Sequence, residues 1–209
     1  MTLDDFPITR KWPPRHPDRI QLYSLTTPNG VKASIMLEET GLPYEPHLVD
    51  FQKDEQKSAE FRSLNPYGKI PAIIDPNGPD GEPLALFESA AILIYLADKS
   101  GKLLAPSGAV RYETLQWLAF QVAGVGPMFG QLGFFHKFAG KDYEDKRPRD
   151  RYRPKRNGFS TCWTSVCKAA VGSWAMNTRL RISPTSRWCA TWSVSMKPRT
   201  WWDSTSTRT

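Results

Sequence analysis

The first hundred residues alternate short apolar runs with stretches of helical periodicity, and clusters of turn residues separate them. Residues 19–25 predict a strand, which ends in the Thr/Pro/Asn/Gly turn at 26–30. Residues 31–40 predict a helix, and Gly41 supplies its C-terminal stop. Residues 44–51 predict a second strand, so this part of the chain reads as a βαβ unit.

The next segment predicts two more strands and two more helices. A brief helix is predicted at 58–64, and residues 69–75 predict a third strand. Pro71 has no N–H to donate to a central ladder, so it should lie at the start of that strand, as a cis peptide in a tight turn. Residues 84–87 predict a fourth strand, and a helix should follow from Glu88-Ser89 through about Lys99.

These elements together predict an α/β thioredoxin-like N-terminal domain over residues 19–101, which Gly101 closes as the stop of the last helix. The order βαβ then ββα is the one that such a domain requires. Residues 1–18 are rich in proline and predict an extended N-terminal arm. Residues 102–108 predict a linker.

Beyond the linker the chain is apolar and rich in Trp and Phe, without strand alternation. Residues 111–122 predict a helix, and residues 128–138 predict another. Gly124, Gly126 and Pro127 predict a kink or break between the two. The simplest interpretation of 109–153 is an all-α C-terminal domain that is incomplete.

Composition excludes several other classes of protein. A chain that is 40% hydrophobic and 12% aromatic is not generically disordered, and we find no 18-residue apolar run that predicts a membrane span. The N-terminus carries Asp4 and Asp5 and no apolar signal segment. The sequence therefore predicts a cytoplasmic globular protein.

The net charge of +7 is confined to the end of the chain. Residues 154–209 contain nine of the 28 Lys and Arg but only one of the 21 acidic residues, so residues 1–153 are close to neutral. The basic residues of the tail form no stripe with an aromatic platform, and nucleic acid is therefore not expected as a partner.

The tail 154–209 differs from the rest of the chain in composition and is interpreted as aberrant and poorly ordered. It holds six of the eight Trp without a helical or strand period, and its three cysteines (Cys162, Cys167, Cys189) match no zinc spacing. Codons compatible with 154–184 can encode, in a shifted reading frame, a peptide with a helical apolar period, i,i+4 charge pairs and a Thr-x-x-Asp N-cap. We interpret the tail as the product of a frame shift.

Residues 1–153 contain no cysteine, so the predicted domain cannot run dithiol chemistry with its own sulfur. A redox-active thioredoxin unit carries Cys-x-x-Cys at the first strand–helix turn, where this chain has Thr26-Thr27-Pro28-Asn29. The domain is therefore either a scaffold or a site for a thiol that a ligand brings.

Four ordered motifs give the chain a family resemblance: LYSLTTPNGVK, NPYGKIPAI, LFESAAILIYLADK and LQWLAFQVAGVGPMFGQ. Over residues 19–153 they resemble the glutathione transferase superfamily, and the first and last resemble its bacterial nu class, which includes glutathione-dependent disulfide reductases. The resemblance implies glutathione as co-substrate and an electrophile or disulfide as second substrate. We expect neither a metal nor a membrane partner. It also implies a homodimer, with the helices near 89–99 and 109–125 at the interface.

The resemblance implies which residues bind glutathione. The backbone of Ile70 beside Pro71 would pair with the cysteinyl segment as a short added strand. Ser89, at a helix N-terminus, would bind the γ-glutamyl carboxylate, and Glu88 would bind the α-ammonium. The remaining implied ligands are Gln56 and Lys69 at the glycyl end, and Arg151.

Thr27 matches the nu-class hydroxyl that faces sulfur, and Asn29 lies beside it in the sequence. A hydroxyl and an amide donor at a helix N-terminus stabilise a thiolate over a thiol, which then attacks an electrophilic carbon, a peroxide or a disulfide. Tyr23 and Ser24 remain alternative thiol-facing hydroxyls, because other transferase classes use Tyr or Ser. Thr27 could also be only a helix cap. The alternatives to an enzyme are a glutathione-binding regulatory or scaffold protein and an inert product.

Overall fold

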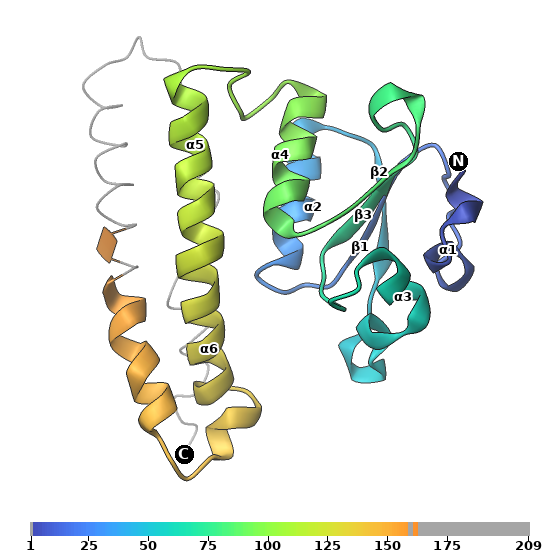
Figure 1. Ribbon diagram of the computed structural model, residues 1–209. Coiled ribbons are helices and arrows are strands. Elements are labelled where there is room, and N and C mark those ends of the chain that lie inside the picture. Colours follow the sequence, from blue (N-terminus) through green and yellow to red (C-terminus); the bar gives the residue numbers. More distant parts are fainter. Residues whose placement is uncertain (1, 159–160, 163–209) are drawn as a thin grey trace, which may run out of the picture. The chain divides into compact units, whose positions relative to one another are not determined.

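The computed structural model describes residues 2–158, 161 and 162 of the 209-residue chain (Figure 1). The chain divides into two compact units, Met1–Pro106 and Ser107–Thr209. The first unit contains a four-stranded sheet, and the described part of the second is helical. Most of the predicted aberrant tail lies outside the described residues.

The sheet of the first unit consists of the four predicted strands, β1 (Ile20–Ser24), β2 (Tyr44–Leu48), β3 (Ala72–Asp75) and β4 (Leu84–Phe87). Their spatial order is β2-β1-β3-β4. Strand β1 runs parallel to β2 and antiparallel to β3, and β4 is antiparallel to β3. This mixed sheet confirms the thioredoxin-like fold.

Two helices, α2 (Gly30–Thr40) and α4 (Ser89–Ser100), pack against each other and cover one face of the sheet (Figure 1). Both end as predicted, because Gly41 and Gly101 adopt the left-handed conformation with φ of 72° and 65°. The Gly41 N–H donates to the Leu37 carbonyl at 2.9 Å and completes the first of these caps. The turn chemistry of the sequence was thus sufficient to predict both helix ends.

The opposite face of the sheet is covered by α1 (Ile8–Lys11) and α3 (Ala59–Leu64) (Figure 1). The Ser58 side chain caps α3 by accepting a hydrogen bond from the Phe61 N–H at 3.2 Å. Phe61, Tyr23 and Ile74 belong to the hydrophobic core between these helices and the sheet. Tyr23 and its neighbour Leu22 on β1 point to opposite faces of the sheet, and both are buried. Both faces of the sheet are therefore covered, and neither is open to solvent.

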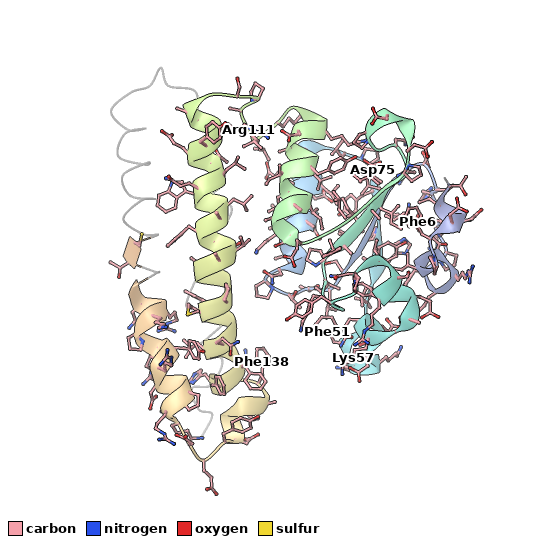
Figure 2. The ribbon with its side chains drawn as sticks, viewed as in Figure 1. Phe6, Phe51, Lys57, Asp75, Arg111 and Phe138 are labelled. Atoms are coloured by element: carbon pink, nitrogen blue, oxygen red, sulfur yellow. The ribbon has the colours of Figure 1, made fainter. Side chains whose placement is uncertain are left out.

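The N-terminal segment is not the extended arm that its prolines predicted. It forms a 3-10 turn at Leu3–Asp5 and then α1, and Leu3 and Ile8 are buried in the core of the α1/α3 face. Phe6 packs against the same core (Figure 2). The prediction was wrong because three apolar side chains within six residues gain more from burial than the prolines cost in regular structure.

The end of this segment is held to the edge strand β2 by polar contacts. The Glu45 carboxylate accepts hydrogen bonds from the backbone N–H groups of Arg15, at 3.1 and 3.0 Å, and His16, at 2.7 Å. The Trp12 indole N–H donates to the Leu48 carbonyl at 3.0 Å. These contacts occupy positions beside an edge strand that would otherwise be open to pairing.

Strand β3 is shorter than predicted and begins at Ala72, so residues 69–71 precede it. The Ile70–Pro71 peptide bond is cis, and Pro71 lies immediately before the strand, as predicted. Among the described residues, no backbone hydrogen-bond partner joins the N–H or C=O of Ile70.

The second unit begins with α5 (Ala109–Phe120) and α6 (Gly126–His136), and a π-helical turn, Gln121–Val125, connects them. This π-helical turn lies where a kink or break was predicted from Gly124, Gly126 and Pro127, and the helical stretch continues through it without a break. Pro127 lies in the first turn of α6, where its missing N–H is tolerated, and the wider π turn precedes it.

A short 3-10 turn follows α6 at Ala139–Asp142, and residues 147–158 are helical. By length and composition alone, the continuous helical stretch Ala109–His136 is long and apolar enough to cross a membrane. The sequence prediction had found no 18-residue apolar run of this kind. Core helices of soluble proteins pass the same test, so this finding is weak evidence for a membrane span.

Candidate glutathione site

The candidate site lies where α2 and α4 begin, after the ends of β1 and β4. Thr27, in the turn after β1, is half-buried, and its Oγ1 accepts a hydrogen bond from the Gly30 N–H at 3.2 Å. Its carbonyl accepts the Val31 N–H at 3.0 Å. Since Oγ1 already accepts from the backbone, its own proton is left to donate to a ligand.

Asn29 is the N-cap residue of α2 and is exposed, but its side chain makes no cap hydrogen bond. Instead its Oδ1 accepts a hydrogen bond from the Lys32 ammonium at 2.8 Å. Asn29 and Thr27 therefore place an amide and a hydroxyl at the N-terminus of one helix, as the sequence predicted.

Lys32 lies beside these residues, and the sequence motifs did not predict it. Its side chain is 5% exposed, and its Nζ lies 2.8 Å from Asn29 Oδ1 and 3.4 Å from Ser89 Oγ. Burial lowers the pKa of Lys32 to about 8, and the Glu88 carboxylate offsets part of this effect. One sequence signal could have identified it, because a lysine in the first turn opposes the helix dipole and needs another reason to be there.

Glu88 and Ser89 form the junction between β4 and α4. Glu88 is exposed and has a left-handed backbone, with φ of 71° and ψ of 115°. Such a conformation costs a non-glycine residue about 1–3 kcal/mol, and it is typical of ligand sites. Ser89 is buried at 7% exposure and contacts Lys32, so the junction that the sequence singled out meets the start of α2.

The segment before β3 contains Ile70, whose backbone the family resemblance implies as a ligand. Ile70 is buried at 8% exposure, and Lys69 is exposed, with its ammonium 5.6 Å from the centre of the Tyr67 ring. The Asn65 amide donates to the Lys69 carbonyl at 2.6 Å and holds the segment from behind. The Ile70 side chain also reaches the start of α2, since a Cβ added at Gly30 would lie 3.1 Å from its Cδ1.

Gln56 lies beside the same segment. A Cβ added at Gly68, where φ is 66°, would approach the Gln56 carbonyl oxygen at 2.8 Å, so the two loops are in close contact. The Gln56 amide donates to Asp54 at 3.3 Å, whereas its buried Oε1 has no hydrogen-bond partner among the described residues. An unpaired buried oxygen of this kind is unfavourable until a donor reaches it.

The oxygens of the two alternative hydroxyls are buried. Tyr23 is fully buried, its ring stacked on His47 at 4.8 Å and edge-on to Trp12 at 5.9 Å, and burial raises the pKa of its hydroxyl. Ser24 Oγ is buried behind Gly30, at 2.5 Å from a Cβ added there. Neither oxygen has a hydrogen-bond partner among the described residues. Of the three candidates, only the Thr27 hydroxyl belongs to a partly exposed turn.

Arg151 is exposed in the helical residues 147–158 of the second unit. Its contact with a ligand held by the first unit stays a prediction. Within the described part of the chain there is no group of three His, Cys, Asp or Glu side chains that could hold a metal ion.

The first unit thus combines donors that suit an anion with one carboxylate that suits an ammonium. The donors are the first N–H groups of α4, the Lys32 ammonium, and the side chains of Thr27, Asn29 and Ser89. Glu88 provides the negative charge. Such a set fits a zwitterionic amino-acid end joined to a further anionic group.

Family and sequence comparisons agree with this geometry. The model of the glutathione S-transferase N-terminal domain matches residues 26–99. The disulfide-bond oxidoreductase YfcG of Escherichia coli (strain K12) is 50% identical over 121 residues, 57% of this chain and 56% of the relative. The disulfide-bond oxidoreductase YghU of the same strain is 42% identical over 132 residues, 60% and 44% of the two chains. The chain spans about half the length of these curated relatives.

Solved structures extend the similarity over most of the chain. A glutathione transferase from Pseudomonas putida, with one glutathione disulfide bound per subunit, is 56% identical with a TM-score of 0.79, covering 94% of this chain and 84% of that one. A glutathione transferase from Burkholderia graminis, with two glutathione molecules bound per subunit, is 58% identical with a TM-score of 0.78, covering 93% and 80%. Identity at this level over such coverage shows that the chain belongs to the glutathione transferase superfamily.

Proposed function

We propose that the chain binds glutathione in its first unit and ionises the thiol with Thr27 and Asn29. The observation that carries this proposal is the half-buried Thr27 hydroxyl, which accepts the Gly30 N–H and stands at the strand–helix turn in place of a cysteine. A hydroxyl donor at a helix N-terminus stabilises a thiolate and lowers the pKa of the thiol.

The rest of the tripeptide is held by the groups that surround this turn. The Ile70 N–H and C=O pair with the cysteinyl segment, which supplies the hydrogen bonds that Ile70 lacks within the described chain. Ser89 and the N-terminus of α4 bind the γ-glutamyl carboxylate, and Glu88 binds the α-ammonium. Gln56 and Lys69 bind the glycyl end, and the family resemblance proposes Arg151 as a further ligand.

Reduction of disulfide bonds is the reaction that we favour. The bound thiolate attacks one sulfur of a disulfide, forms a mixed disulfide and releases the other sulfur as a thiolate, which takes a proton from water. A second glutathione thiolate then attacks the mixed disulfide, which forms glutathione disulfide and releases the remaining substrate sulfur as a thiolate that also takes a proton from water. The names of YfcG and YghU support this reaction, as do the glutathione disulfide and the glutathione pair bound in the two related structures.

Transfer of glutathione to an electrophilic carbon is the second candidate. The same thiolate would form a carbon–sulfur bond as the leaving group departs. The name of glutathione S-transferase 2 of Schizosaccharomyces pombe, which is 42% identical over 115 residues, supports it.

We further propose a cytoplasmic homodimer that meets neither nucleic acid nor membrane, with α4 and residues 109–125 at its interface. We also propose that residues 154–209 arise from a shifted reading frame. Sequencing of the coding DNA tests the latter, since codons incompatible with the alternative frame would refute it.

The function is tested by glutathione-dependent reduction of hydroxyethyl disulfide. Thr27→Ala should lower kcat/KM by more than about tenfold while glutathione affinity changes little, because a hydrogen bond to a charged sulfur is lost. Thr26→Ala is the matched control, since Thr26 is the exposed neighbour in the same turn. An unchanged rate in Thr27→Ala would remove Thr27 from the mechanism. Binding without turnover by the unaltered chain would indicate a scaffold, and no binding an inert product.

A further inference from the structure

The buried ammonium of Lys32 connects the two ends of the proposed glutathione site. Its Nζ contacts Asn29 at the start of α2 and Ser89 at the start of α4. In the proposed complex, Asn29 lies on the thiol side of the ligand and Ser89 on the γ-glutamyl side. No role in the site was predicted for Lys32 from the sequence.

An ammonium has three donor hydrogens and no acceptor, so it fixes the direction of every hydrogen bond that it makes. When Lys32 donates to Asn29 Oδ1, the amide oxygen is occupied and the amide nitrogen must face away from the lysine. When Lys32 donates to Ser89 Oγ, the serine proton must likewise point elsewhere. Both side chains are left with a donor for a third partner.

We propose that Lys32 is a positioning residue that holds the Asn29 amide and the Ser89 hydroxyl as donors toward the bound tripeptide. This inference rests on the proposed function, because the third partners are the glutathione thiolate and the γ-glutamyl carboxylate. Lys32 acts through Asn29 and Ser89 and does not itself need to touch the ligand.

A role in packing alone does not account for a lysine at this position. The side chain is 5% exposed in the first turn of a helix, where both burial and the helix dipole disfavour a positive charge. Burial lowers the pKa of Lys32 to about 8. The exposed Glu88 carboxylate compensates only part of it, whereas an anionic ligand held by the neighbouring donors would stabilise the charged form.

The test compares Lys32→Met with the unaltered full chain in two measurements. The ultraviolet absorbance of the thiolate gives the pKa of bound glutathione, and calorimetry gives the affinity for S-methylglutathione, which has no ionisable thiol. We expect Lys32→Met to raise the thiol pKa by about one unit and to weaken S-methylglutathione binding by about tenfold. Either value unchanged in a folded variant would overturn the proposal.

Lys102→Met is the matched control. Lys102 also joins α2 to the region after α4, because its ammonium donates to the Thr40 carbonyl at 2.6 Å, but it does so at the opposite ends of the helices. Its replacement should leave the thiol pKa and the affinity unchanged, and an equal effect would identify a merely structural role for Lys32.

Lys32→Gln is a second variant in case Lys32→Met does not fold. Its amide can accept as well as donate, so the direction of the bonds to Asn29 and Ser89 is no longer fixed, and the same two shifts are expected. If the unaltered chain does not bind S-methylglutathione, the proposed function fails. If the unaltered chain binds S-methylglutathione and the lysine variants have the same affinity and thiol pKa, only the role of Lys32 fails.

Discussion

Gly30 lies so close to Ser24 that a Cβ added to the glycine would meet the serine Oγ at 2.5 Å. The carbonyl oxygen of Leu25 would lie even nearer, at 2.0 Å. The first turn of α2 can therefore approach the end of β1 only because residue 30 has no side chain, and this approach sets the position of Thr27.

Gly30→Ala should force α2 away from β1. We expect the free energy of unfolding to fall by about 1–3 kcal/mol, as in overpacked cores, and glutathione affinity to fall with it. Urea unfolding and calorimetry measure the two effects. Gly130→Ala is the control, since nothing lies within 4 Å of a Cβ there and alanine favours the helix by about 1 kcal/mol. Wild-type stability in Gly30→Ala would contradict the packing described.

Glu45→Ala should release the N-terminal segment from the edge of the sheet. The variant loses the hydrogen bonds that the carboxylate accepts from the backbone of Arg15 and His16. We expect the free energy of unfolding, measured in urea, to fall by about 1.5–3 kcal/mol. Proteolysis before residue 19 should become faster. Glu39→Ala replaces an exposed glutamate on α2 and should change stability by less than about 0.5 kcal/mol. Equal losses in the two variants would argue against a specific clamp.

Acid should destabilise the fold through His47. Burial lowers the pKa of His47, the Glu45 carboxylate opposes this effect, and Arg15 adds to it. The unfolded chain therefore binds a proton at higher pH than the folded chain does. The contribution of neutral His47 to the free energy of unfolding is complete above the pKa of histidine in the unfolded chain, about 6.5. It is lost as the pH falls below that value, by at most about 1.4 kcal/mol per pH unit.

Urea unfolding at about pH 7.5 and about pH 5.5 measures this dependence across the histidine range. His47→Gln keeps an amide within reach of Gln21, which contacts the His47 ring at 2.7 Å, and cannot take up a proton. Its stability should fall less over the same interval. Parallel curves for the two proteins would assign the dependence to other groups.

Tyr23→Phe tests the Tyr23 hydroxyl as the alternative to Thr27. The Tyr23 hydroxyl is buried and has no partner among the described residues, so its removal should raise the free energy of unfolding by up to about 1 kcal/mol. Glutathione-dependent turnover should stay at the wild-type rate. A tenfold loss of turnover without a loss of stability would return Tyr23 to the thiol-facing position.

Local sequence signals were sufficient for the elements of the first unit. Gly41, Gly101 and Pro71 end or begin their elements as turn chemistry requires, and these rules act over a few residues. The packing of Leu3 and Ile8 was not predictable in this way, because it depends on a core assembled from distant strands.

The same limit applied to the candidate site. The family motifs singled out Thr27 and Ser89, and both lie where a helix starts, Thr27 in the turn before α2 and Ser89 as the first residue of α4. The role of Lys32 depends on Ser89, a residue 57 positions away, which no periodicity within α2 reveals. Only the packing of α2 on α4 brings the lysine to the serine.

The absence of cysteine from the first unit has a consequence for oxidative damage. In an enzyme that uses its own thiol, oxidation to a sulfinic or sulfonic acid inactivates the chain, and in most cases nothing restores it. In the proposed reaction the vulnerable sulfur belongs to a diffusible peptide. An overoxidised glutathione molecule dissociates and an intact one takes its place. The protein therefore keeps its activity under oxidation that would irreversibly inactivate an enzyme with a catalytic cysteine.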